Sequence, residues 1–247
     1  MTVLDIFEFL NERFPFSTAA EWDNSGLLLG DKKNTVTKVV ISLDCTESTV
    51  NLAEEIGAEL IITHHPLIFP ETESILANTL IPRLNERGIS LISAHTNLDK
   101  ATGGVNDCLS AALGLKNVKK IPTFEDFTIN LGEIDKELSP EDFAKYVGEK
   151  LKVTPRFNEG KTSIKTVAVC GGSGGDFLPY AINANADAYV TADIKHHVFL
   201  DANICGITLV DGGHYATEDT VTEPLKALLQ TKFPRILFVT NHIIAFR

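Results

Sequence analysis

The chain has 247 residues, of which 44% are hydrophobic and 22% charged, and its formal net charge is −11. This length allows two modest α/β lobes or one large domain, with ample core, and no apolar run approaches the roughly 20 residues that span a bilayer. The acidic charge argues against binding to a nucleic-acid polymer, because nothing basic would replace its counterions. A single nucleotide or phosphorylated metabolite is compatible with this charge if a metal ion supplies positive charge.

The N-terminal segment and the cysteines indicate a cytoplasmic protein. Residues 1–14 combine an apolar periodic pattern with three acids, which is typical of an amphipathic helix and not of a signal peptide. The four cysteines are widely scattered: Cys45, Cys108, Cys170 and Cys205. The absence of a CxxC pair favours reduced thiols and argues against a thiolate zinc site.

Short apolar runs alternate with amphipathic segments in the first half of the chain. We predict strands at residues 38–43, 59–63 and 89–93, and helices at residues 46–56, with Thr46 as cap, and 81–88, closed by Gly88. Strands that alternate with helices indicate βαβ units and a largely parallel sheet.

The second half repeats this plan. We predict a strand at 165–171, a helix at 177–186, a strand at 187–197 that ends in a second histidine pair, and a strand before "DGGHYATE". An internal duplication explains the repeat; the general similarity of buried strands that follow helices is the alternative. A helix capped by Ser139 lies between the halves. We expect two similar α/β lobes, residues 1–122 and 123–247, with mixed, largely parallel sheets.

Six of the seven histidines fall at or just beyond the expected carboxyl end of a strand: His64, His65, His95, His196, His197 and His214. Ligands bind at this edge in open α/β sheets. We expect the seventh, His242, to be structural.

Two carboxylates accompany these histidines. His214 and Glu218 are four residues apart and share one face of a helix, so both could bind the same ion or adjacent ions. The alternative is a solvated first turn in which Glu218 complements the helix dipole. Asp99 is either a further ligand or a cap for a helix over residues 105–113.

The candidate metal ligands are then three imidazoles and two carboxylates: His64, His65, Asp99, His214 and Glu218. This set of nitrogen and oxygen donors suits zinc, iron, manganese, cobalt or nickel. Two ions roughly 3.5–4 Å apart would use five ligands better than one ion would.

Four motifs together resemble the NIF-three-like dinuclear-metal family, whose members are also named GTP cyclohydrolase 1 type 2 homolog: EWDNSGLLLG, ITHHPLIF, AHTNLDKATGGVND and DGGHYATE. The resemblance runs from about residue 3 to the C-terminus and matches the short form, without an inserted middle domain. It implies a two-lobed α/β fold, a dinuclear site in a cleft formed by the five ligands named above, and a toroidal homohexamer. Ala192 stands where the family often has glycine, which bears on the shape of the cleft.

Further side chains are candidates for lining that cleft. Asp193, Lys195 and His197 follow the strand that corresponds to the HHP strand. In EWDNSGLLLG, Trp22 is a packing residue and residues 23–26 are an ordinary turn, or else Asn24 reaches the cleft.

The expected function is metal-dependent hydrolysis of a small nucleotide-like or phosphorylated substrate, with His95 as the proton-transfer group. The alternative is a non-enzymatic protein that binds or delivers metal with a partner. The type of fold and site does not determine a substrate.

Overall fold

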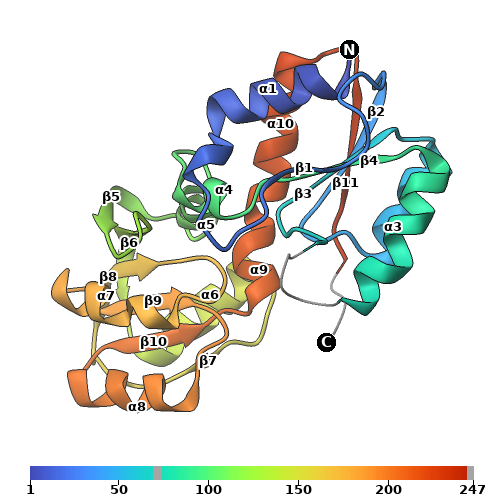
Figure 1. Ribbon diagram of the computed structural model, residues 1–247. Coiled ribbons are helices and arrows are strands. Elements are labelled where there is room, and N and C mark those ends of the chain that lie inside the picture. The colour runs from blue at the N-terminus through green and yellow to red at the C-terminus, as the bar shows by residue number, and fades with distance from the viewer. Residues whose placement is uncertain (69–73, 244–247) are drawn as a thin grey trace. The chain divides into compact units, whose positions relative to one another are not determined.

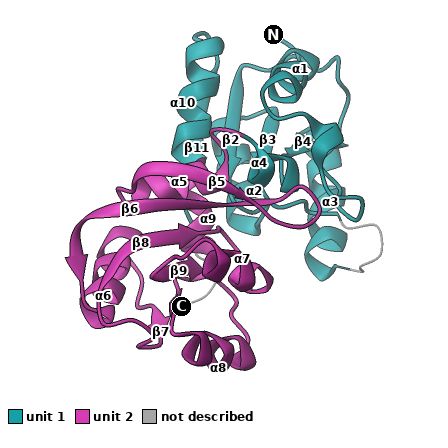
Figure 2. Ribbon diagram, turned by 90° about the vertical axis from the view of Figure 1, so that its left-hand side faces the viewer, with its two compact units in different colours: residues 1–101, 222–247 teal, residues 102–221 magenta. Residues whose placement is uncertain are grey.

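The computed structural model describes residues 1–68 and 74–243 and contains two α/β units, which Figure 2 colours separately. Unit 1 comprises Met1–Ala101 and Thr222–Arg247, and unit 2 comprises Thr102–Val221. The mixed α/β architecture predicted from the sequence is confirmed. Phe69, the last residue of the motif ITHHPLIF, lies outside the described residues.

The two units differ from the predicted division at residue 122, because both ends of unit 1 contribute to one sheet. Strand β11 (Leu237–Asn241) pairs in parallel with β2 (Lys38–Ser42). Strand β5 (Lys116–Pro122), which precedes the predicted boundary, pairs instead with β6 (Thr128–Leu138) of unit 2. Unit 2 is therefore one continuous segment inserted into unit 1.

The sheet of unit 1 has the order β1-β4-β3-β2-β11, and only the β1–β4 pair is antiparallel. Its other elements are β1 (Gly26–Leu29), β3 (Leu60–Thr63), β4 (Ser90–Ser93), α1 (Val3–Arg13), η1 (Phe16–Thr18), α2 (Glu47–Ile56), α3 (Ile75–Arg87), α4 (Thr96–Lys100) and α10 (Thr222–Lys232).

Helices cover both faces of this sheet, as Figure 1 shows for α1 and α10 on one side and α3 on the other. Because strand side chains alternate between faces, Val40, Ile61 and Leu91 pack against α2 and α3 in one buried cluster. Burial on both faces explains why these strands read as continuous apolar runs.

The sheet of unit 2 has the order β5-β6-β8-β9-β10-β7, in which β8, β9 and β10 are parallel to one another. The remaining elements are α5 (Val105–Ala112), α6 (Pro140–Leu151), β7 (Arg156–Phe157), β8 (Ile164–Val169), η2 (Gly175–Phe177), α7 (Leu178–Asn183), β9 (Ala188–Thr191), α8 (His196–Cys205), β10 (Thr208–Asp211), α9 (His214–Glu218) and η3 (Asp219–Val221).

Unit 2 also has a buried cluster on each face of its sheet. Ala168, Tyr189 and Leu209 pack with residues of α7 and α8, whereas Val169 and Val190 pack with residues of α5 and α6. The βαβαβ order of β2–β4 in unit 1 recurs as β8–β10 in unit 2. The structure thus contains the repeated plan that the sequence indicated.

Local signals in the sequence predict several helix ends correctly. Thr46 forms a capping box at the start of α2, Ser139 caps α6, and Gly88 ends α3 in the left-handed region at φ 64°. The strand predicted over residues 187–197 is wrong beyond Thr191, because His196 begins α8. None of the helices in the described ranges is both long and apolar enough to cross a membrane.

Candidate metal centre

The histidine pair occupies the point where β3 ends. The amides of His64 and His65 donate to the carbonyls of Ser42 and Leu43, at 3.3 and 2.9 Å, so the backbone still follows β2 there. The Thr63 hydroxyl then donates to the His65 carbonyl at 2.7 Å, which turns the chain. The two rings lie with centroids 5.0 Å apart. The pair therefore sits where strand alternation breaks down, as the sequence required.

A hydrogen-bond acceptor faces the Nδ1 atom of each of these rings. His64 Nδ1 lies 2.8 Å from the Ala94 carbonyl oxygen, and His65 Nδ1 lies 2.7 Å from a carboxylate oxygen of Asp44. Because both oxygens only accept, Nδ1 carries the proton in each neutral ring and Nε2 carries the lone pair. This tautomer is the one in which Nε2 can bind a metal.

His95 is held in the same way by Asp23. Its Nδ1 lies 2.8 Å from Asp23 Oδ1, and the Asp23 side chain is fully buried. The other carboxylate oxygen accepts from the hydroxyls of Ser25 and Thr96, at 2.8 and 2.5 Å, and from the Thr96 amide at 3.1 Å. Asp23 therefore connects the EWDNSG turn to the start of α4.

These hydrogen bonds determine the charge of Asp23. Burial favours the neutral acid, but the bonds from His95, Thr96 and Ser25 outweigh it and hold the pKa of Asp23 far below its usual value of 3.8. Asp23 is thus a carboxylate at neutral pH and keeps the proton of His95 on Nδ1.

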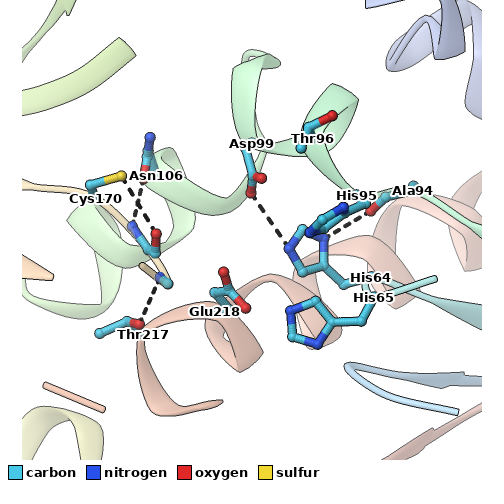
Figure 3. Close-up of polar contacts among 12 residues, drawn as sticks. His64, His65, Ala94, His95, Thr96, Asp99, Asn106, Cys170, Thr217 and Glu218 are labelled. Atoms are coloured by element: carbon cyan, nitrogen blue, oxygen red, sulfur yellow. Dashed lines mark hydrogen bonds and ion pairs between the residues drawn. The ribbon is translucent and has the colours of Figure 1, made fainter. Parts of the chain in front are cut away.

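Asp99 belongs to α4 and faces the histidines. Its Oδ1 lies 3.5 Å from His64 Nε2, as Figure 3 shows. The alternative prediction that Asp99 caps the next helix is wrong, because Gly104 is the N-cap residue of α5.

One donor atom from each of His64, His65 and His95 lies within 4.8 Å of the other two. We call these three histidines and Asp99 the strand-end set. Two nitrogens bound to one zinc ion, at about 2.0–2.1 Å each, are at most about 4 Å apart. The three histidines could therefore hold a divalent transition metal after small side-chain adjustments.

Unit 2 carries the other two predicted ligands on α9. His214 Nε2 lies 3.0 Å from Glu218 Oε2, and Nδ1 lies 2.6 Å from Asp193 Oδ2. Gly213 precedes them with φ 78°, a conformation that favours glycine. We call His214 and Glu218 the α9 pair. Both donors lie on one helical face, as predicted, and the Glu218 side chain is only 6% exposed.

The other candidate residues have different surroundings. Asn24 donates to the Ile68 carbonyl at 2.7 Å and so holds the loop after the histidine pair. Trp22 is 57% exposed and touches the His95 ring edge-on, with centroids 5.9 Å apart. Lys195 is the exposed N-cap residue of α8, and His242 Nε2 lies 3.0 Å from Glu223 Oε1.

His196 and His197 are in the first turn of α8 and are exposed. His197 lines a surface hollow of unit 2 together with residues of α7. The expectation that this second pair follows a strand end directly is wrong, because β9 stops at Thr191 and a helix begins after four intervening residues.

Sequence patterns singled out Asp193, which holds His214, but did not identify Asp44 and Asp23, which hold His65 and His95. Asp44 lies two residues after the end of β2, so its position near a strand end was a usable signal. Asp23 precedes β1 in a turn-like stretch, and its role depends on contact with His95, 72 residues away. No local pattern reveals a partner at that separation.

The fold and these side chains define an α/β protein with clustered imidazoles and carboxylates that could hold a metal ion. The chain belongs to the Duf34/NIF3 (NGG1p interacting factor 3) family, whose model matches residues 1–246. The family suggested by the four motifs is thereby confirmed.

Relatives and solved structures agree with this assignment. A Staphylococcus aureus protein named GTP cyclohydrolase 1 type 2 homolog is 31% identical over 345 aligned positions, which cover 94% of each chain. Because those positions exceed the 247 residues here, that relative has residues that this chain lacks. A Clostridium perfringens protein of the same name is 35% identical over 228 residues, covering 88% of this chain and 87% of its own.

The fold matches solved structures over nearly their whole length. A Staphylococcus aureus hypothetical protein has a TM-score of 0.92 and 34% identity, covering 100% of this chain and 99% of that one. Reduced HcgD from Methanocaldococcus jannaschii has a TM-score of 0.83 and 29% identity, covering 97% of both chains.

Replacing Asp23 by Asn should destabilise the protein, because the amide puts a donor where several donors already converge. We expect a loss of about 1–3 kcal/mol in the free energy of unfolding at pH 7, measured by urea titration with a chelator present. The folded-state pKa of Asp23 lies below its unfolded value of 3.8, so its stabilisation is complete above that pH and lost as pH falls toward the folded value.

The difference in the free energy of unfolding between wild type and Asp23→Asn should therefore become smaller as the pH is lowered from 7 to 3. Asp201→Asn, at an exposed position of α8, is the control and should change stability little. A constant difference across this pH range would contradict the assigned charge of Asp23.

Proposed function

We propose that this protein binds two divalent transition-metal ions per chain and hydrolyses a small nucleotide-like or phosphorylated substrate with them. The proposed ligands are His64, His65, Asp99, His214 and Glu218. Zinc, iron, manganese, cobalt and nickel all suit this set of donors.

One observation carries this proposal: an oxygen acceptor faces Nδ1 in each imidazole of the ligand set. The acceptors are Ala94 for His64, Asp44 for His65 and Asp193 for His214. Such contacts fix the orientation of a metal-binding histidine and raise the basicity of its Nε2. Three histidines with purely structural roles would not each need an oxygen acceptor at Nδ1.

The α9 pair supplies too few donors to complete a metal site by itself. The α9 pair supplies two donors, whereas catalytic zinc sites use three protein ligands and structural sites use four. We propose that the five named ligands together hold the two ions, as the family resemblance implies.

The bound ions would lower the pKa of a water molecule and polarise a carbonyl or phosphoryl oxygen of the substrate, which makes the attached carbon or phosphorus more electrophilic. The residues of the chain hold the donors in place: Asp44 orients His65, and Asp193 orients His214. Because Asp193 is 55% exposed, its contribution should be weaker than that of the buried Asp23.

His95 is the proposed proton-transfer group. Asp23 keeps the proton of the neutral ring on Nδ1, so Nε2 is the atom that accepts a proton and later returns it. The charge of Asp23 also stabilises the imidazolium that forms when Nε2 accepts that proton.

The names of the relatives suggest one substrate class. They are called GTP cyclohydrolase 1 type 2 homologs, which points to hydrolytic opening of a guanine ring. We therefore place GTP first in a panel of nucleotides and phosphoesters.

The four cysteines remain thiols, which supports the proposed cytoplasmic location.

A second candidate function is metal binding or delivery without catalysis, together with a partner. The clustering of His95 with His64 and His65 favours this second function, because it would let His95 bind metal as a third imidazole ligand. His95 would then no longer be available as the proton-transfer group. The two functions predict different behaviour when His95 is replaced.

Elemental analysis of carefully prepared protein should approach two transition-metal ions per chain. His64→Ala and His214→Ala should each lower the metal content while circular dichroism stays unchanged, because the two residues lie at the ends of elements and not in the apolar cores. His242→Ala is the control and should keep both ions. Metal content near zero after reconstitution of wild type would refute the proposal.

Replacing His95 by Gln should reduce turnover of the substrate by about 100- to 10,000-fold and leave two ions bound. Asp99→Ala should instead lose both metal and turnover. If His95→Gln loses metal as Asp99→Ala does, His95 is a ligand. If wild type with two ions turns over nothing in the panel, the binding function is favoured.

We further propose that the chains assemble into a closed homohexameric ring, as the family resemblance implies. A ring would surround the metal sites and admit small molecules more readily than polymers. Light scattering should then give about six times the 27.0 kDa of one chain. A mass near one chain would refute assembly.

A further inference from the structure

A glycine-rich loop follows β8 in unit 2, with the sequence CGGSGGDF over residues 170–177. Its backbone is held from three elements. The Gly171 amide donates to Asn106 Oδ1 of α5 at 2.8 Å, and the Gly172 amide donates to Thr217 Oγ1 of α9 at 3.0 Å (Figure 3). The Gly172 carbonyl accepts from the Thr191 hydroxyl at the end of β9, at 2.9 Å.

The side chain of Glu218 occupies the space beside Gly172. A Cβ atom added at residue 172 would lie 2.0 Å from Glu218 Oε1, 2.9 Å from Glu218 Cδ and 3.4 Å from His214 Nε2. Real Cβ contacts are essentially never shorter than 3.0 Å. The carboxylate and a side chain at residue 172 therefore exclude each other.

Thr217 docks the same turn of α9 onto the loop. It is fully buried, and its hydroxyl both accepts from the Gly172 amide and bonds to the carbonyl of Gly213 at 3.0 Å. Glu218 is the next residue, so the hydrogen bond at Thr217 fixes the backbone position from which the Glu218 side chain extends. The loop thus sets both the position of the helix turn and the space that its carboxylate fills.

We propose that Gly172 is a positioning residue for Glu218: its backbone seats the carboxylate, and the missing side chain keeps both donors of the α9 pair available to a metal. This inference rests on the proposed metal binding by His214 and Glu218. It extends the determinants of that binding to a loop that supplies no ligand itself.

Backbone strain is the competing explanation for any effect of substitution, because Gly172 has φ +63°. Gly206 provides a matched control in the same unit. It ends α8 with φ +67°, and a Cβ there would find its nearest neighbour, the Gly160 carbonyl oxygen, at 3.8 Å. Alanine is strained equally at both positions, but only at residue 172 does it collide with a donor.

The test is titration of the metal-free full chain with Co²⁺, followed by its visible absorption. Gly172→Ala should bind Co²⁺ about 10- to 100-fold more weakly than wild type, with an altered spectrum for the ions that remain. Gly206→Ala should match wild type in both readouts. Circular dichroism of both variants should match that of wild type.

A double-variant cycle tests whether the effect passes through Glu218. Glu218→Ala should weaken Co²⁺ binding, and adding Gly172→Ala to it should weaken binding no further. Thr217→Val removes the bond to the Gly172 amide without adding a collision. It should also reduce affinity, which keeps the inference testable if Gly172→Ala does not fold.

The outcomes separate the two proposals. Failure of wild type to bind Co²⁺ would contradict the proposed function itself. If wild type binds Co²⁺ and Gly172→Ala binds it equally well, only the role of Gly172 is overturned. An equal loss from Gly172→Ala with and without Glu218 would also overturn it, since the loop would then act through other residues.

Discussion

The candidate site depends on one constraint: a histidine presents Nε2 to an ion or a substrate only if something accepts the proton on Nδ1 and holds the ring. In unit 1 these acceptors are Ala94 after β4, Asp44 after β2 and Asp23 before β1. Each belongs to a different strand end, so the register of the sheet sets the orientation of the rings. The sheet therefore helps to orient the candidate ligands as well as to support them.

Local chemistry made much of the fold predictable from the sequence. The apolar runs that became β2, β3 and β4 are buried on both faces, and such runs are recognisable without knowledge of their partners. Thr46 caps the start of α2 and Gly88 ends α3, and both signals are local to the helix concerned. The candidate ligands were recognisable for a related reason: imidazoles that follow buried strands gather at one sheet edge.

Long-range pairing was not predictable in the same way. Strand β5 is mostly exposed and rich in lysine, so it lacks the apolar alternation that marks a half-buried strand. The extent of unit 1 depends on the pairing of β11 with β2, about 200 residues earlier. The surroundings of Asp23 and Gly172 are also set by distant contacts, since each meets a candidate site residue that is remote in the sequence.

The inserted position of unit 2 affects the order in which the two units fold during translation. Because domains generally fold as units while synthesis proceeds from the N-terminus, residues 102–221 emerge as one uninterrupted segment and can fold as soon as they leave the ribosome. Unit 1 begins first but must wait for β11, which pairs with β2 and is synthesised only after the whole of unit 2. Until then β2 has an open edge, and the nascent protein carries a strand able to pair with a neighbouring polypeptide.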